Sequence, residues 1–538
     1  MKKIFSNNFV LALFSGLLLI PGWFEWGSGI VAMIAFVPLL WLIEKMVTQK
    51  NGGRRVFLLS TLAFLVWNLA TTWWVKNASF PGMLAAVFVS TFFMSIPMWL
   101  TYKVRTAWGI KAGLFAFVVF WIAFEFAYLH GEISWPWLTL GHGFAYEVKL
   151  IQWYELTGVL GGSLWILLVN VFVFSAIQQS TLQKVKSKNY TIAAVLVFIL
   201  PLLVSLVWYY IYTEKENPRR IVVVQPNMDP YLKFNDIAPI EHAMVQIQEA
   251  TKHIDGETDF VVTPETSLLG NFWIGEFEQV EDVQLIRQLL TQYPQCNYVA
   301  GIVCRKQYGP GDNIPTTARP LAQQGFYYDY FNSAILVDTT REIQIYHKSQ
   351  LVTGIEKMPY SNQLKFLKKI MLNLGGTFRS NATQPERSVL LAKNDSIRIA
   401  PVICWESVFG EYVTDYVKLG ANYIFVITND GWWGNTPGHR QHNSLSSIRA
   451  IETRRSIARS ANTGISSFIN QRGDVLQQLG WWKRGALVDT LNANDKITFY
   501  VRYGDYLGRM AFFTGILLVV LLLSFRMKAW LGLDNKKS

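Results

Sequence analysis

The stretch Ile397-Arg-Ile-Ala-Pro-Val-Ile-Cys-Trp-Glu406 decides how the second half of the chain folds. Its apolar, β-branched residues predict a short buried strand, which ends on a cysteine followed by an aromatic and an acidic residue. Two other strand-like runs end on an ionisable side chain, Asp259-Phe-Val-Val-Thr-Pro-Glu265 and Glu342-Ile-Gln-Ile-Tyr-His-Lys348. Because sites in α/β domains form beyond strand ends, we expect the cysteine, the glutamate and the lysine to meet at one sheet edge.

Strand and helix patterns alternate on both sides of this stretch, which predicts a layered α/β domain. Asn429 follows another strand end and is expected near the same edge. The expected strands are 221–225, 259–263, 298–303, 333–338, 342–346, 397–403, 423–428 and 465–470, and the expected helices are 238–254, 281–292, 411–419 and 440–456.

The rest of the chain is far more apolar. Hydrophobic residues make up 51% of the 538 residues and charged residues only 16%. We expect a transmembrane domain of about seven spans at 1–212, a polar domain at 213–508, and a closing transmembrane helix with its tail at 509–538. The expected spans lie near 9–20, 28–46, 56–75, 82–101, 112–130, 159–179, 190–212 and 510–527.

Lysine and arginine predict the orientation of these spans. The net charge is +12, and the cations gather in the loops on one side of the spans, which the positive-inside rule places in the cytoplasm. Seven preceding spans then put 213–508 outside. The sequence has no basic stripe with interleaved aromatics, so nucleic acid is not an expected partner. Its three cysteines are too few for a disulfide framework.

Two features of the apolar part allow alternative interpretations. Glu125 lies within an apolar span, where an ionisable group is a functional candidate; the alternative is a hydrogen bond between helices near the outer interface. The loop 131–158 is rich in aromatic residues, which predicts an interfacial belt for most of it or a cover over a lipid entrance.

Glu265, Lys348 and Cys404 together suit acyl transfer through a thioester. A cysteine attacks as thiolate, a glutamate can accept the thiol proton, and a lysine can stabilise both the thiolate and the developing oxyanion. Each residue alone has an ordinary interpretation as a packed thiol or a solvated charge. His439 and His442 resemble a metal pair, but the sequence offers no apparent third ligand, so we expect no metal. It also lacks a phosphate-binding glycine loop, and we expect no cofactor.

At these residues the chain resembles the nitrilase superfamily, and within it the family of apolipoprotein N-acyltransferases, which are bacterial membrane enzymes. The resemblance covers nearly the whole chain. It implies a multi-pass α-helical membrane domain plus an α/β nitrilase-like αββα sandwich. The matching stretches are Thr263-Pro-Glu-Thr266, Tyr346–Val352, Glu356, Ile403-Cys-Trp-Glu406, Thr428–Gly434, Gln441-His442, Arg449–Glu452, Ala461–Ile465, Trp135–Leu138, Gly158 and Asn170.

The resemblance implies a role for each matching residue. Glu265 would be the general base, Lys348 the electrostatic stabiliser and Cys404 the nucleophile. Phe234 stands where the family has a functional tryptophan, which leaves an apolar lid role but removes the indole N–H. Supporting or substrate-binding roles fall to Glu356, Trp405, Glu406, Phe234, Asn429 and Trp432.

The implied reaction moves an acyl chain from a phospholipid to Cys404 and then to the α-amine of a diacylglyceryl apolipoprotein. The expected setting is the bacterial inner membrane, with a monomer in the lipid bilayer and its catalytic domain on the periplasmic side. Two alternatives remain at this point: a membrane-tethered amidase with the same three residues, or a non-catalytic protein that binds lipoprotein or lipid.

Overall fold

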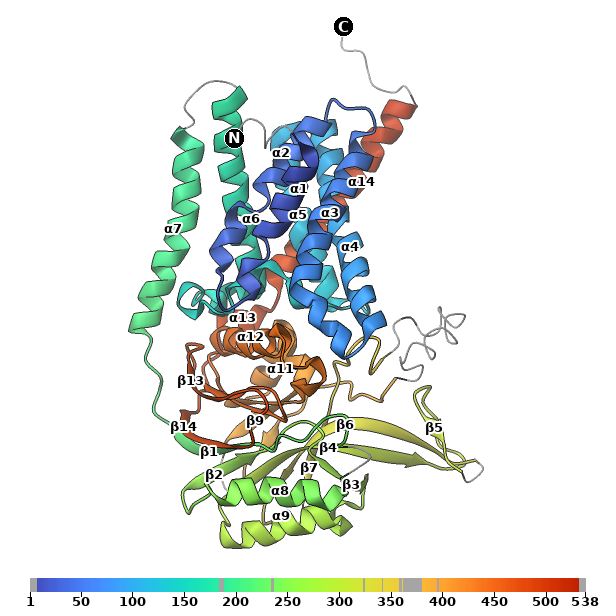
Figure 1. Cartoon of the computed structure of the whole chain (residues 1–538), viewed down its shortest axis with the longest axis vertical. Helices are drawn as coiled ribbons and strands as arrows, with labels where there is room; N and C mark the ends of the chain where they lie inside the picture. The colour runs from blue at the N-terminus through green and yellow to red at the C-terminus, as the bar shows by residue number, and fades with distance from the viewer. Residues whose placement is uncertain are drawn as a thin grey trace. The chain divides into compact units, whose positions relative to one another are not determined.

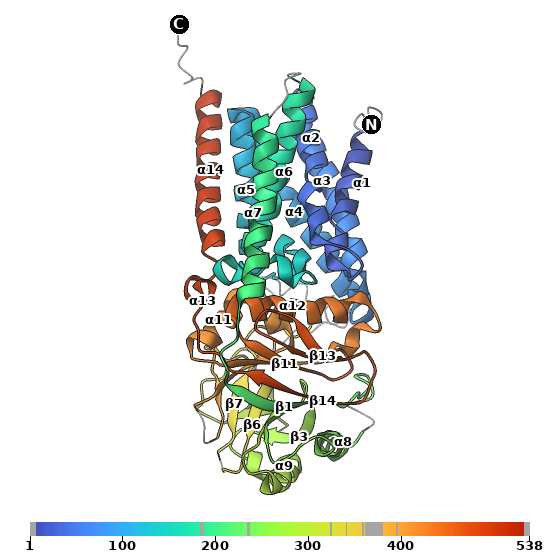
Figure 2. The same cartoon turned by 90° about the vertical axis from the view of Figure 1, so that its left-hand side faces the viewer.

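A computed structural model describes residues 7–182, 188–233, 237–322, 325–340, 342–357, 360, 380–393 and 396–531. The chain divides into two compact units (Figures 1 and 2). A helical unit comprises Met1–Trp73, Gly82–Trp208 and Asp505–Ser538. An α/β unit comprises Trp74–Pro81 and Tyr209–Gly504, so a short segment between two membrane helices belongs to it.

The helical unit is built from long apolar helices. Among the described residues, seven helical segments are long and apolar enough to cross a membrane. The first expected span, near 9–20, is instead the 11-residue helix α1 (Asn8–Leu18), because Pro21 and Gly22 follow in a short 3-10 turn. The other helices are α2 (Val37–Met46), α3 (Gly52–Thr72), α4 (Phe80–Trp108), α5 (Ile110–His130), α6 (Tyr154–Leu182), α7 (Lys188–Ile211) and α14 (Tyr506–Trp530).

The aromatic loop after α5 packs inside the helical unit. It forms three 3-10 turns, and Trp137 is only 1% exposed. Glu125 Oε1 accepts hydrogen bonds from the backbone N–H of Leu140 at 2.8 Å and from Trp121 Nε1 at 2.9 Å. Glu125 therefore anchors this loop, whereas the sequence suggested a bond between helices or a functional group.

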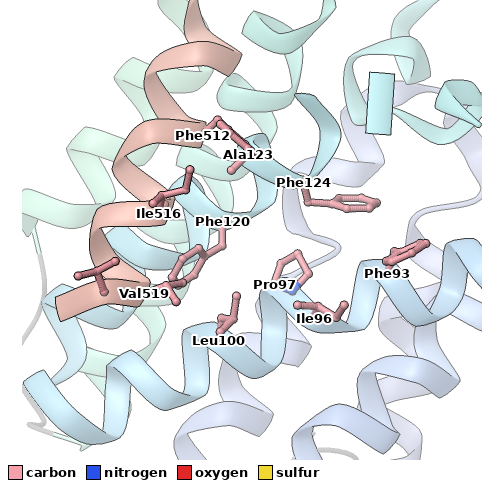
Figure 3. A pocket seen from close by; sticks show the side chains of 12 residues that line it. Phe93, Ile96, Pro97, Leu100, Phe120, Ala123, Phe124, Phe512, Ile516 and Val519 are labelled. Carbon is pink, nitrogen blue, oxygen red and sulfur yellow. The ribbon is translucent and has the colours of Figure 1, made fainter. Parts of the chain in front are cut away.

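An apolar cavity of about 360 Å³ lies among α4, α5 and α14 (Figure 3). Phe93, Pro97, Phe120 and Phe512 are among its twelve lining residues, and every one of the twelve is apolar. This lining supplies no acid, base or nucleophile, so the cavity holds no catalytic group.

Two sheets form the centre of the α/β unit. The first has the order β14-β1-β2-β4-β6-β5, with β3 beside β4 and β7 beside β6. Its strands are β1 (Pro218–Gln225), β2 (Thr258–Val262), β3 (Leu268–Trp273), β4 (Asn297–Tyr308), β5 (Arg319–Pro320), β6 (Tyr327–Val337), β7 (Gln344–His347) and β14 (Gly485–Asn492).

The second sheet has the order β13-β12-β11-β10-β9-β8, and its central strands β9, β10 and β11 run parallel. The eight strands expected from sequence are all present, whereas β11 was not expected and begins at Ser456, the last residue of the expected helix 440–456. The strands of this sheet are β8 (Leu390–Leu391), β9 (Arg398–Ile403), β10 (Tyr423–Thr428), β11 (Ser456–Ala461), β12 (Ser466–Ile469) and β13 (Val475–Leu479).

Helices cover the outer faces of the two sheets, as the αββα expectation requires. Helices α8 (Pro239–Thr251) and α9 (Glu281–Gln292) pack on the first sheet, and α11 (Gly410–Lys418) and α12 (Pro437–Thr453) pack on the second (Figures 1 and 2). Val222, Val224 and Val261 belong to the core under α8 and α9. Between the sheets, the rings of Phe260 and Phe425 lie 5.3 Å apart.

Candidate active site

The candidate site forms where several strands end. Glu265 follows β2, Lys348 follows β7, Cys404 follows β9 and Asn429 follows β10. Strands β9 and β10 are parallel neighbours, which brings their carboxyl ends to the same edge of the second sheet. The structure therefore delivers the four residues from both sheets of the sandwich.

Lys348 lies between two carboxylates in the interior. Its Nζ is 3.1 Å from Oε1 of Glu265 and 3.0 Å from Oε1 of Glu356, and the lysine is 1% exposed. Burial alone would lower the pKa of Lys348, but Glu265 and Glu356 raise it well above its usual value. The site therefore holds a permanent cation that is available to a developing negative charge.

The two carboxylates are held by further donors. The amide nitrogen of Asn332, on β6, donates to Oε1 of Glu265 at 2.7 Å and to Oε1 of Glu356 at 3.2 Å. The backbone N–H of Asn429 donates to Oε2 of Glu265 at 3.1 Å. Glu356 also accepts the backbone N–H of Val352 at 2.8 Å. The bonds from Asn332 and Asn429 fix the direction of the Glu265 carboxylate.

Cys404 occupies a sharp turn between β9 and the 3-10 helix Cys404–Val408. Its φ is +50°, a conformation that costs energy for a side chain other than glycine. The residue is partly exposed, whereas Cys296 and Cys304 are buried. Burial and the Glu265 carboxylate raise the pKa of Cys404, while Lys348 and the Thr428 hydroxyl oppose that rise. The resting group is a thiol, so its attack on a carbonyl needs a proton acceptor.

Glu406 is a buried carboxylate that fastens this turn. Its Oε2 accepts the backbone N–H of Ile403 at 2.8 Å, and its Oε1 accepts the backbone N–H of Ser349 at 2.8 Å. The hydroxyls of Tyr346 and Tyr412 donate to Oε1 at 2.6 and 2.5 Å. Glu406 thus connects the loop after Lys348 to the end of strand β9, which directly precedes Cys404.

The aromatic residues expected around the site differ in their surroundings. Trp405 is 3% exposed and packs on Phe409, so it is part of the interior and not of an open pocket wall. Trp432 is partly buried and its ring lies 5.2 Å from that of Tyr231. Phe234 lies outside the described residues. Asn429 meets Glu265 through its backbone, and its side chain accepts a hydrogen bond from Asn462.

Two residues of the site do not follow from the sequence reasoning. Asn332 is a buried amide inside the apolar run of β6, and that interruption of the strand pattern was its available signal. Lys233 is 1% exposed, and its Nζ donates to Thr266 Oγ1 at 2.9 Å and to the Glu265 carbonyl at 3.4 Å. Burial lowers the pKa of Lys233 to about 7, although Glu265 opposes the shift.

The chain matches two protein families. Residues 220–497 match the family described as carbon-nitrogen hydrolase, and residues 15–172 match the apolipoprotein N-acyltransferase N-terminal domain. The first match covers the sandwich and all the site residues described above.

Relatives match over almost the full length. The chain is 29% identical to the apolipoprotein N-acyltransferase of Chlorobaculum tepidum, with 94% of each chain covered. It is 25% identical to that of Geobacter metallireducens, covering 93% of this chain and 92% of the relative. A solved amidase structure from Nesterenkonia sp. is 17% identical, with 55% of this chain and 98% of that chain covered and a TM-score of 0.36.

Proposed function

The chain belongs to the carbon-nitrogen hydrolase family, whose match spans more than half its length, and from this premise we propose that it is an apolipoprotein N-acyltransferase. In this proposal it takes an acyl chain from a phospholipid, holds it as a thioester on Cys404, and passes it to the α-amine of a diacylglyceryl-cysteine at a lipoprotein N-terminus. The full-length relatives carry this name, and both matched families occur together in this chain.

One observation carries the proposal. A buried Glu265–Lys348–Glu356 cluster stands beside a partly exposed cysteine on a strained turn, in a chain with seven helical segments apolar enough to cross a membrane. The cluster supplies a base and a cation for a thiol nucleophile. The membrane helices match substrates that are themselves lipids, which a tethered amidase acting on small substrates would not need.

The first half-reaction forms the thioester. Glu265 takes the proton from the Cys404 thiol as the sulfur attacks the ester carbonyl of the phospholipid. The carbonyl oxygen gains negative charge, which the ammonium of Lys348 stabilises. The tetrahedral adduct then expels the glycerol oxygen, and Glu265 returns the proton to it. The products are S-acyl Cys404 and a lysophospholipid.

The second half-reaction makes an amide. The neutral α-amine of the diacylglyceryl-cysteine attacks the thioester carbonyl, and Lys348 again stabilises the oxyanion. Collapse breaks the C–S bond, and the proton lost by the amine passes through Glu265 to the departing sulfur. The thiol of Cys404 and a triacylated lipoprotein result. Exclusion of water protects the thioester between the two steps.

The cation distribution supports a location on the outer side of a bacterial inner membrane. Lysine and arginine gather in the loops on one side of the expected spans, and the positive-inside rule favours the opposite side of the bilayer for the α/β unit. There it reaches phospholipid of the outer leaflet and lipoproteins still anchored in the same leaflet. We propose that it works as a monomer, since all the site residues come from one chain.

Intact-mass analysis tests this function. The purified full chain is incubated with phospholipid, and the wild type is compared with Cys404→Ser. The wild type should gain the mass of one acyl chain, which neutral hydroxylamine removes, and a diacylated lipopeptide should then receive that chain on its amine. Failure of any phospholipid to acylate the wild type, together with retained lipopeptide binding, would replace the transferase with a binding protein.

A further inference from the structure

A second buried polar network lies behind Cys404 and shares no residue with the Glu265–Lys348–Glu356 cluster. Its centre is Asp430, which follows Asn429 and is 0% exposed. Oδ2 of Asp430 lies 2.8 Å from Nη2 of Arg459, and Oδ1 lies 2.9 Å from Nδ1 of His442. Arg459 and His442 are also 0% exposed. A Cβ at Gly464 would lie 2.7 Å from Oδ2, so glycine leaves room for this carboxylate.

The network reaches Cys404 through its backbone. The Thr428 hydroxyl donates to Oδ1 of Asp430 at 2.8 Å, so this oxygen is bonded to both Thr428 and His442. Nε2 of His442 lies 3.3 Å from the Cys404 carbonyl oxygen and 3.0 Å from Ser407 Oγ. Ser407 Oγ itself donates to the same carbonyl at 2.8 Å.

We propose that Asp430 and His442 are positioning residues that hold Cys404 in its attacking geometry. At one end of the network Thr428 supports Asp430, and at the other end His442 and Ser407 steady the peptide after the cysteine. This inference rests on the proposed role of Cys404 as nucleophile and adds a device that sets its orientation.

Backbone geometry explains why such a device is needed. A φ of +50° is unfavourable for cysteine, so the turn relaxes unless neighbouring groups hold it. The peptide bond is planar, so a fixed Cys404 carbonyl also fixes the direction of the following N–H. Both the thiol and that N–H lie beside the carbonyl carbon under attack, and small misplacement at that point slows the reaction strongly.

Helix α12 offers a matched comparison. His439 and His442 are both buried on this helix, but His439 stacks on Trp481 with ring centroids 4.5 Å apart, whereas His442 bonds the Cys404 turn. His442→Ala and His439→Ala remove the same buried ring from the same helix. We expect kcat for acyl transfer to fall about 10- to 100-fold in His442→Ala, with the KM for phospholipid within twofold, and to change less than threefold in His439→Ala.

A second pair of variants, at Thr428, avoids the packing defect that removal of a buried histidine ring leaves. Thr428→Val removes the hydroxyl at nearly constant volume, and Thr428→Ser keeps it. Because the Thr428 hydroxyl supports Asp430, and Asp430 in turn holds His442 against the Cys404 turn, the valine variant should slow alkylation of Cys404 by iodoacetamide at pH 8, and the serine variant should restore the rate. Peptide mapping assigns the alkylated cysteine.

The outcomes separate the two proposals. Thermal unfolding first shows that each variant is folded. Equal kcat for His442→Ala and His439→Ala, or equal alkylation rates for Thr428→Val and Thr428→Ser, then overturns the positioning role. Alkylation of Cys404 requires no lipid, so it reports on the network by itself. Wild-type protein that never accepts an acyl chain, but shows the expected alkylation difference at Thr428, would overturn the acyl-transfer function and leave the positioning role supported.

Discussion

The carboxylate of Glu406 accepts the backbone N–H of Ser349 at 2.8 Å, one residue beyond Lys348. The same carboxylate accepts the N–H of Ile403, one residue before Cys404. A single buried side chain therefore sets the spacing between the proposed cation and the proposed nucleophile, although they come from different sheets.

Glu406→Gln should separate these two loops. The amide keeps one acceptor oxygen but presents N–H groups to donors, so several buried bonds are lost at once. We expect kcat to fall about 10- to 100-fold and the free energy of unfolding to fall by about 2–3 kcal/mol. An activity assay measures kcat, and thermal unfolding measures the loss of stability. Glu386→Gln, at an exposed carboxylate, is the control, and an unchanged kcat for Glu406→Gln would show that the loops keep their spacing unaided.

Lys348→Met should leave the carboxylates of Glu265 and Glu356 facing each other without a cation. Breaking a buried ion pair in this way costs about 3–5 kcal/mol. Adding Glu356→Gln removes one of the two charges, so the double variant should regain stability while acyl-enzyme formation stays abolished. Unfolding of the two single variants and the double variant gives the coupling free energy. Additive losses would argue that the two side chains act independently.

Lys233 should make stability depend on pH. Its pKa is lowered to about 7 by burial, whereas an unfolded lysine titrates near 10.4. Between these values the unfolded chain binds a proton that the folded chain does not, so stability rises with pH across this window. The melting temperature of the wild type should therefore increase relative to Lys233→Met between about pH 7 and 10.

The control for this experiment is Lys252→Met, because the Lys252 side chain is 59% exposed, whereas Lys233 is buried. The difference in melting temperature between wild type and Lys252→Met should not vary with pH. If the difference in melting temperature between wild type and Lys233→Met is also independent of pH, Lys233 remains charged in the folded protein.

Trp74→Ala should destabilise the α/β unit. Trp74 is 1% exposed, its ring lies 4.8 Å from that of Trp433, and its Nε1 donates to Gln441 at 3.2 Å. Truncation of a buried tryptophan costs about 3–5 kcal/mol. The neighbouring Trp73 is 36% exposed, so Trp73→Ala should cost much less. Similar melting temperatures for the two variants would contradict the packing described for Trp74.

Much of the fold follows from local pattern. The β-branched runs of β1, β9 and β10 are short, apolar and buried, and they predict strands without reference to the rest of the chain. Strand β11 is different because it carries Arg459 and four other polar or small residues, and a run of that composition is typical of an exposed segment. Its burial depends on Asp430, a partner 29 positions earlier that no local pattern reveals.

The candidate site, too, could be predicted only in part from local sequence. Ionisable residues at strand ends can be found in the sequence, and Glu265 and Lys348 do meet. Asn332 and Lys233 contribute through contacts across 67 and 33 positions of the chain, which depend on how strands pair and loops return. The resemblance implied a supporting or substrate-binding role for Trp405. Its burial against Phe409 is a packing contact that the sequence pattern does not reveal.

The segment Trp74–Pro81 has a practical consequence for anyone who wishes to excise the α/β unit of this protein. A gene fragment starting at Tyr209 omits Trp74 and Asn77, and Asn77 donates to the Trp433 carbonyl at 2.7 Å. The fragment would carry an open slot beside Gly438, where a tryptophan ring lies within 2.6 Å of the position a Cβ would take. Such a fragment requires the missing octapeptide, either fused through a linker or added in trans, before it can stand alone.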